Sequence, residues 1–294
     1  MIFSKPIRCF KVVSKLCALI LLFFTINSCK KKEIDNEIDS VIDYCLCQNE
    51  FISIPSIVNS KSQFKDGLKR YGNDFNQVLA LTDCSVDSLY GDTSGYYQGS
   101  YSNLSNLPVF EFNYQTGCNS SFDNRTRSGK LKATFTKPIS QIGCDIKVNP
   151  SNYKLKLDNG TDISLNGQLN YSRINNSDWQ TKVVNGLVTD ANWTTNFSED
   201  ISLKYISGIN DSLVFNEIYE ITGQGEGISR NGKKYSFTVK TPLVKKTNFK
   251  WIISGSVELV PEGLEPRIIN FGAGELDNLA TFEVNGSIFS FNLR

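Results

Sequence analysis

The chain has 294 residues, with 31 basic and 30 acidic side chains, a formal net charge of +1 and no histidine. A nearly neutral chain lacks the basic field that a nucleic-acid-binding groove needs, so we expect no nucleic-acid partner. Without histidine, Ser-His-Asp and Cys-His catalytic sites and histidine-ligated zinc sites are excluded.

The first 28 residues have the pattern of a lipoprotein signal peptide. A nine-residue apolar run covers 16–24, and Ser28-Cys29 follows it. Four basic residues precede the run: Lys5, Arg8, Lys11 and Lys15. As a helix this run would cover about 14 Å, roughly half of a hydrocarbon core, so we expect a cleaved signal and no membrane span. Cleavage before Cys29 would leave an N-terminus that carries acyl chains such as palmitate and anchors the protein to a membrane.

Removal of residues 1–28 takes away four basic residues and no acidic ones, so the mature chain has a formal net charge of −3. Its length allows one large domain with its own core. We predict three parts: the signal peptide 1–28, a lipidated tether and helical segment 29–80, and an antiparallel β domain 81–294.

The segment 29–80 carries two apolar patterns with helical spacing. The first contains Ile34, Ile38, Val41 and Cys45, and the second covers 64–79. Pro55 and the polar residues after it mark a connection between two short helices.

From Cys84 onward the apolar residues alternate with polar ones, as in 108–114, 130–136 and 153–157, which predicts strands with one wet face. Five Asn-Gly pairs punctuate the region: Asn159-Gly160, Asn166-Gly167, Asn185-Gly186, Asn231-Gly232 and Asn285-Gly286. Asn-Gly favours the type I′ turn of a tight hairpin, so we expect several of these to be hairpins. The predicted fold class is therefore all-β. We expect an antiparallel meander, arranged as a two-layer sandwich or as a curved, partly open barrel, with a short helical N-terminal segment.

Two hairpins allow a prediction of register. A two-residue loop at Asn285-Gly286 sets Phe282 opposite Phe289, and one at Asn231-Gly232 sets Ile228 opposite Tyr235.

The strand before Asn231 carries Gly223, Gly225 and Gly227, so one of its faces has no side chains. Such a bare face either lets a flat ligand approach or marks a bend or a place that receives large side chains, and we favour the structural interpretation.

One loop combines a carboxylate with two guanidinium groups, Asp123, Arg125 and Arg127. It is a candidate ligand loop for an anionic sugar or carboxylate, although a capped turn with a local ion pair is the favoured alternative. Cys45-Leu46-Cys47 is one residue shorter than Cys-x-x-Cys, and no second pair follows it. We predict no metal site and no cofactor.

Several segments of the β region resemble a family of uncharacterised outer-membrane lipoproteins of the Bacteroidota. They are Tyr219–Gly223, Ser229–Lys233, Gly117-Cys118 with Asp123, Arg125 and Arg127–Lys130, Trp251 with Ser254–Glu258, Asp277-Asn278, and Val284–Gly286. The resemblance implies a β-rich architecture and an envelope location, and it gives no catalytic residue. It also implies a disulfide between Cys84 and Cys118, worth ~3 to 4 kcal/mol for the loop that it closes. Cys144 would then pair with Cys45 or Cys47.

The sequence therefore predicts a lipid-anchored envelope protein that acts as a non-catalytic binding or structural module at the outer membrane, with the periplasmic face favoured over the cell surface. The expected partner is the membrane itself, which the protein contacts through the lipid anchor on Cys29. The alternative is a carboxylate-dependent enzyme acting on glycans, with its acids drawn from Asp200, Glu217, Glu220 and Glu226. The feature expected to separate a ligand carrier from a structural role is a cavity enclosed by the sheet.

Overall fold

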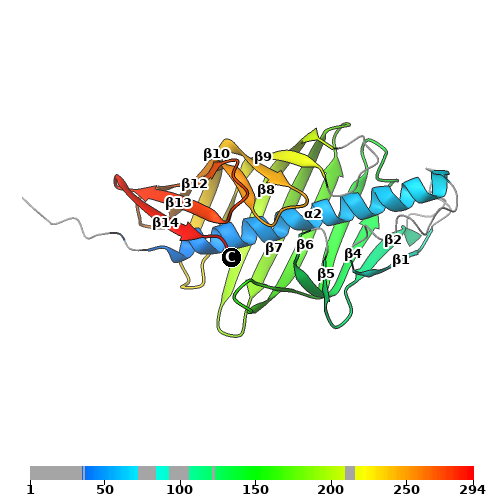
Figure 1. Cartoon of the computed structure of the whole chain (residues 1–294), viewed down its shortest axis with the longest axis horizontal. Helices are drawn as coiled ribbons and strands as arrows, with labels where there is room; N and C mark the ends of the chain where they lie inside the picture. The colour runs from blue at the N-terminus through cyan, green and yellow to red at the C-terminus, as the bar shows by residue number, and fades with distance from the viewer. Residues whose placement is uncertain (1–34, 36, 72–83, 93–105, 121–122, 209–215) are drawn as a thin grey trace, which may run out of the picture. The chain divides into compact units, whose positions relative to one another are not determined.

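The alternation of buried and exposed residues builds one long antiparallel sheet (Figure 1). A computed structural model describes residues 35, 37–71, 84–92, 106–120, 123–208 and 216–294. The signal peptide, Cys29 and the end of the second predicted helix lie outside these residues. The strands are β1 (Val86–Tyr90), β2 (Val109–Asn113), β3 (Cys118–Asn119), β4 (Thr126–Phe135), β5 (Asp145–Lys156), β6 (Asp162–Arg173), β7 (Asp178–Thr189), β8 (Thr194–Ser207), β9 (Ile218–Ile228), β10 (Lys234–Lys246), β11 (Ile252–Pro261), β12 (Arg267–Ala273), β13 (Leu279–Val284) and β14 (Ser287–Asn292).

Consecutive strands pair throughout, except that the short β3 pairs only with β4 and β2 pairs directly with β4. The sheet is a meander that begins at β1, ends at β14 and is not closed. The all-β prediction is confirmed. The described residues form a single sheet, so the observed arrangement is the curved, open one.

The N-terminal segment forms one helix, α2 (Asp39–Tyr71), where the sequence predicted two. The helix continues through Pro55, although proline has no N–H to bond the carbonyl of Phe51. Every residue from Asp43 to Asn59 is buried. Tertiary burial therefore holds the helix together where the local sequence favours a break, and burial on all sides explains why no single apolar stripe marks it.

The sheet curves around α2, which contacts strands on opposite sides. Gln48 Nε2 donates a hydrogen bond to Glu199 Oε2 of β8 at 2.8 Å, whereas Glu50 forms an ion pair with Arg125, just before β4. Residues two apart on an α-helix point about 200° away from each other. The concave side of the sheet is consequently filled by the chain's own helix.

One side of α2 carries a series of ion pairs to the sheet and its loops. They are Asp43–Arg230, Glu50–Arg125 and Lys61–Asp87. The three helix residues lie within about 20° of one another around the helix axis. Arg230 follows β9, whereas Asp87 belongs to β1 and Arg125 directly precedes β4, so these pairs connect both halves of the open sheet to the same face of α2.

The glycine-rich strand β9 has a different register from the predicted one. Tyr235 lies opposite Gly227 and Phe237 opposite Gly225, one residue away from the two-residue-loop prediction, which was wrong. The loop has three residues, because the Ser229 N–H donates to the Lys233 carbonyl at 2.8 Å.

This register lets aromatic rings lie over β9. Phe197 of β8 and Phe237 of β10 stack with ring centroids 5.6 Å apart and planes 7° apart, although β9 lies between their strands. A Cβ atom on Gly225 would be 2.6 Å from the Phe237 ring. The bare face therefore receives large side chains, which come from the neighbouring strands.

The remaining Asn-Gly pairs fall into three kinds. Asn285-Gly286 is the predicted two-residue hairpin, with Val284 opposite Ser287 and Phe282 opposite Phe289. Asn159-Gly160 lies in a three-residue loop. Asn166-Gly167 and Asn185-Gly186 are not turns: they form irregularities inside β6 and β7.

Cys84 and Cys118 form a disulfide, with their Cα atoms 5.8 Å apart, as the family resemblance implied. The predicted pairing of Cys144 with Cys45 or Cys47 is wrong, because all three are free and buried. The Cys144 thiol instead donates to the Lys137 carbonyl, and the other two lie on the enclosed helix.

Candidate binding groove

The predicted ligand loop is turned into the protein. Arg127 is fully buried and donates to both carboxylate oxygens of Asp123, at 2.8 Å for Oδ1, and to the Tyr153 hydroxyl at 3.1 Å. Arg125 is 5% exposed and pairs with Glu50. Burial raises the pKa of Asp123, but the charge and hydrogen bonds of Arg127, together with the charges of Arg125 and Lys245, outweigh burial and hold that pKa below its usual value. The geometry is that of an ion-paired turn, whose guanidinium groups already have partners.

Lys245 lies in the same buried cluster, although in the sequence it is indistinguishable from an ordinary strand lysine. Its ammonium donates to the carbonyls of Phe249 and Lys250. Burial, followed by the charge of Arg125, lowers its pKa to about 7. Enclosed in this way, Lys245 secures the turn between β10 and β11.

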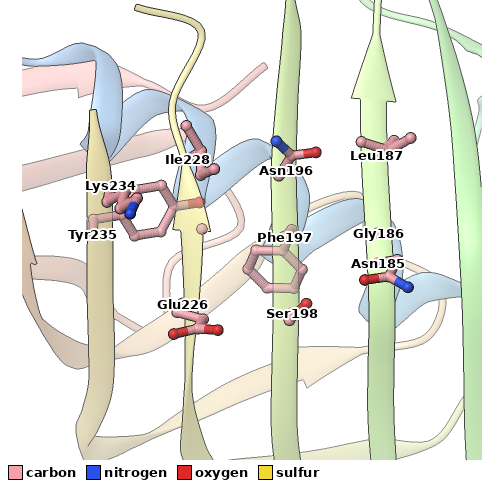
Figure 2. A pocket seen from close by; sticks show the side chains of 11 residues that line it. Asn185, Gly186, Leu187, Asn196, Phe197, Ser198, Glu226, Ile228, Lys234 and Tyr235 are labelled. Carbon is pink, nitrogen blue, oxygen red and sulfur yellow. The ribbon is translucent and has the colours of Figure 1, made fainter. Parts of the chain in front are cut away.

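A groove of about 560 Å³ lies over β7, β8, β9 and β10. No residue of α2 lines it, and the helix ribbon lies behind the strands in Figure 2. The groove is therefore on the outer face of the sheet. Phe197 and Tyr235 form part of its floor. Their rings point inward, where they pack near Tyr44 of the helix.

Strand register aligns the outward side chains of the groove in rows. Leu187, Asn196, Ile228 and Lys234 lie directly opposite one another on four successive strands. At the usual spacing between strands this row is about 14 Å long. Figure 2 shows the four side chains following one another across the strands.

A second row runs beside the first, about 7 Å further along the strands. Ser198 lies opposite Glu226, and Asn185 adds an amide from β7 (Figure 2). Glu226 and Lys234 are diagonal neighbours on paired strands, and within the described part of the chain they form no ion pair with each other. The groove thus offers two amides, a hydroxyl, one carboxylate and one ammonium between two aliphatic side chains.

The two internal Asn-Gly pairs shape the rim of the groove. Asn185 has a φ of 51°, at the register shift between Val183 and Gly186 in the pairing of β7 with β8. On the neighbouring strand, a Cβ atom on Gly167 would lie 2.8 Å from the Asn185 carbonyl oxygen. These two irregularities lie side by side, which only small residues permit. The two Asn-Gly pairs are visible in the sequence, but their local pattern predicts turns.

The acids proposed for catalysis are not gathered in the groove. Among the described residues, Glu226 is the only acid that lines the groove, and Asp200 pairs on the surface with Lys182 at 2.7 Å. None of the three tryptophans lines the groove; Trp179, for example, is buried and stacks on Tyr171 at 4.2 Å.

Among the described residues, no group of three or more cysteine, aspartate or glutamate side chains is arranged to hold a metal ion. Of the described helices, none combines the length and the apolar character needed to cross a membrane.

Comparison of the chain with protein-family models, with curated proteins and with solved structures finds no match. The likeness to Bacteroidota lipoproteins stays a prediction.

Proposed function

We propose that this chain is a lipid-anchored protein of the cell envelope, held at the outer membrane through Cys29, which works on the periplasmic face as a non-catalytic binding module. The signal-peptide pattern of residues 1–28 supports the anchor and the compartment. The disulfide at the start of the sheet suits an oxidising compartment.

The helix that fills the concave side of the sheet argues against a carrier that encloses its ligand, so the observation that carries a binding role is the groove on the outer face. Because α2 occupies the concave side of the sheet, a ligand has the outer groove as its concave contact surface. Asn185, Asn196 and Ser198 supply neutral donors and acceptors, which suit a polar, mostly uncharged chain. A glycan lying across the strands would meet one side chain of each row per strand.

The enzyme alternative requires two carboxylates that face each other across a bond. Glu226 is the only acid in the groove, and binding without catalysis is the function that this residue set supports better.

The test is calorimetric titration of the mature chain, carrying Cys29→Ser, with soluble fragments of envelope glycans. Asn196→Trp would fill the middle of the groove, and we expect it to weaken binding at least about tenfold, since a bulky ring excludes the ligand. Ser202→Trp is the matched control, because Ser202 is exposed on the same strand and lies outside the groove. Equal affinities for the two variants would contradict the role of the groove. Palmitate labelling of the full chain, lost with Cys29→Ser, tests the anchor separately.

A further inference from the structure

The last strand of the sheet has an open edge. β14 pairs with β13 on one side, and no strand of the described residues lies beyond it on the other. An edge strand presents a row of backbone N–H and C=O groups that pair readily with a further strand. The run Ser287–Asn292 is therefore a place where a strand of another chain can be added to the sheet.

The hydrogen bonds between β13 and β14 determine which backbone groups are open. The Leu293 N–H donates to the Asn278 carbonyl at 2.7 Å, so these two residues form a hydrogen-bonded pair. Bonded and non-bonded pairs alternate along an antiparallel ladder, and this ladder has no register shift. Phe291 and Phe289 therefore bond to β13. The residues that alternate with them turn their N–H and C=O groups to the open side: Ile288, Ser290 and Asn292.

Nothing in the sequence of β14 opposes the addition of a strand. Edge strands that avoid such pairing carry charged residues, proline or a bulge. β14 contains no charge and no proline, and its pairing with β13 is regular. The three residues with open backbone groups are exposed, and the exposed fraction of Ile288 is 70%. A strand that approaches this edge therefore meets accessible backbone without electrostatic repulsion.

The inner face of β14 carries two aromatic rings that are only half-buried, Phe289 and Phe291. Both contact Phe282 of β13, with ring centroids 5.0 and 6.2 Å away. Toward the open edge, no strand of the described residues lies next to them. An occupant of this edge thus gains most if it supplies a backbone together with large apolar side chains on the same face.

β14 itself has these properties, because its sequence is symmetric about Ser290, with a phenylalanine on each side. A two-fold axis at this serine pairs two copies of β14 antiparallel. The bonded pairs are then Ser290 with Ser290 and Ile288 with Asn292, so every open backbone group of the three residues finds a partner. Phe289 lies opposite Phe291 of the second copy at a non-bonded position, where side chains are closest.

We infer that β14 joins two copies of this chain by an antiparallel pairing centred on Ser290, which continues the sheet from one copy into the other. Because β14 carries no charge, the pairing brings no like charges of this strand face to face. Three strands, β11 to β13, lie between β14 and the groove, so the inference does not depend on the proposed function.

The test is analytical ultracentrifugation of the mature chain with Cys29→Ser over a range of concentrations, in which we expect the parent to form a dimer. Ser290→Lys sets two ammonium groups opposite each other at the axis, and we expect it to raise the dimer dissociation constant at least about tenfold. Ser290→Asp should have the same effect through two carboxylates. An equal mixture of the two variants should restore the dimer, because the axis then joins an ammonium with a carboxylate.

Ser236→Lys is the matched control, because Ser236 is an exposed serine on β10, which has a strand on each side. It should dimerise like the parent. A parent that stays monomeric at every concentration would overturn the inference and leave the edge to a strand of another protein. So would a dimer that Ser290→Lys does not weaken, or one that the mixture fails to restore, since the copies would then meet elsewhere.

Discussion

Two buried glutamates show how one residue type is accommodated in two ways. Glu50 faces Arg125, so its charge is compensated inside the protein. Glu199 is also buried, but its Oε2 accepts an amide hydrogen bond from Gln48, and its Oε1 has no hydrogen-bond partner among the residues that the structure describes. Burial raises the pKa of Glu199 from 4.5 to about 8, so its carboxyl is mostly protonated near neutral pH.

The pH dependence of stability follows from this raised pKa. Between pH 4.5 and about 8 the folded state holds a proton on Glu199 that the unfolded state has lost, so stability falls as pH rises through this window. Glu199→Gln removes this dependence and keeps an acceptor for Gln48. We expect the variant to be about 4 kcal/mol more stable than the parent at pH 8, or roughly 8 to 16 °C in Tm, and nearly equal at pH 4.5.

Thermal unfolding at both pH values measures this effect. Glu226→Gln is the control, because Glu226 is exposed on the neighbouring strand. A gain in Tm of the same size at pH 4.5 and pH 8 would show that the proton on Glu199 is not its cause.

At the scale of the element, α2 depends on charge pairs more than on an apolar stripe. Its buried residues include Asp43, Gln48, Glu50 and Lys61, whose partners come from the sheet and its loops. Glu37 begins the arrangement, because its carboxylate accepts hydrogen bonds from both the backbone N–H and the hydroxyl of Ser40 in the first turn. The sheet therefore specifies the position of the helix through polar contacts at fixed points along it.

Breaking one of these pairs should be costly. Glu50→Gln leaves the Arg125 guanidinium buried without a counter-charge, and we expect a loss of about 3 to 5 kcal/mol in the free energy of unfolding. Arg125→Met combined with Glu50→Gln should recover more than half of that loss, because no charge then stays buried alone. Urea unfolding of both single variants and the double variant completes the cycle; additive losses would mean that the two side chains do not interact.

Local sequence signals predicted the elements correctly where residues close together in the sequence determine the structure. The hairpin at Asn285-Gly286 and the alternating strand 130–136 are of this kind. Pro55 and the pair Asn185-Gly186 have equally clear local signals that predicted a break and a turn, yet they lie inside a helix and a strand. At both places packing against residues distant in the sequence outweighs the local preference, and one sequence without its contacts does not contain that information.

At the scale of the whole molecule, the all-β meander could be predicted because antiparallel pairing follows from alternation and short turns. The groove could not, because it depends on which residues of β7 to β10 come into register across four strands. A shift of one residue at the loop after Ile228 would have placed Tyr235 opposite Ile228 instead of Gly227. The enclosure of α2 was equally hidden, since its partners are up to 192 residues away.

These distant contacts predict slow folding. Asp43 binds Arg230, 187 residues away, and Arg267 donates to the Glu37 carbonyl, 230 residues away. We expect the main refolding phase to take seconds or longer at 25 °C, because long loops must close before such contacts form. Fluorescence of the buried Trp179 would follow it, and a double-jump experiment with brief unfolding removes the contribution of proline isomerisation. A millisecond main phase would contradict this expectation.

The enclosed position of α2 also has a consequence for biosynthesis. The helix is made before every strand that covers it. Arg267, which donates to the Glu37 carbonyl just before the helix, is added more than two hundred residues later. Until those strands are made, the segment 40–59, with Phe51 and several isoleucines, has no folded strands to pack against. A chaperone that holds unfolded chains would find its binding site in the segment that ends up at the centre of the folded protein, and the last strands to arrive would displace it.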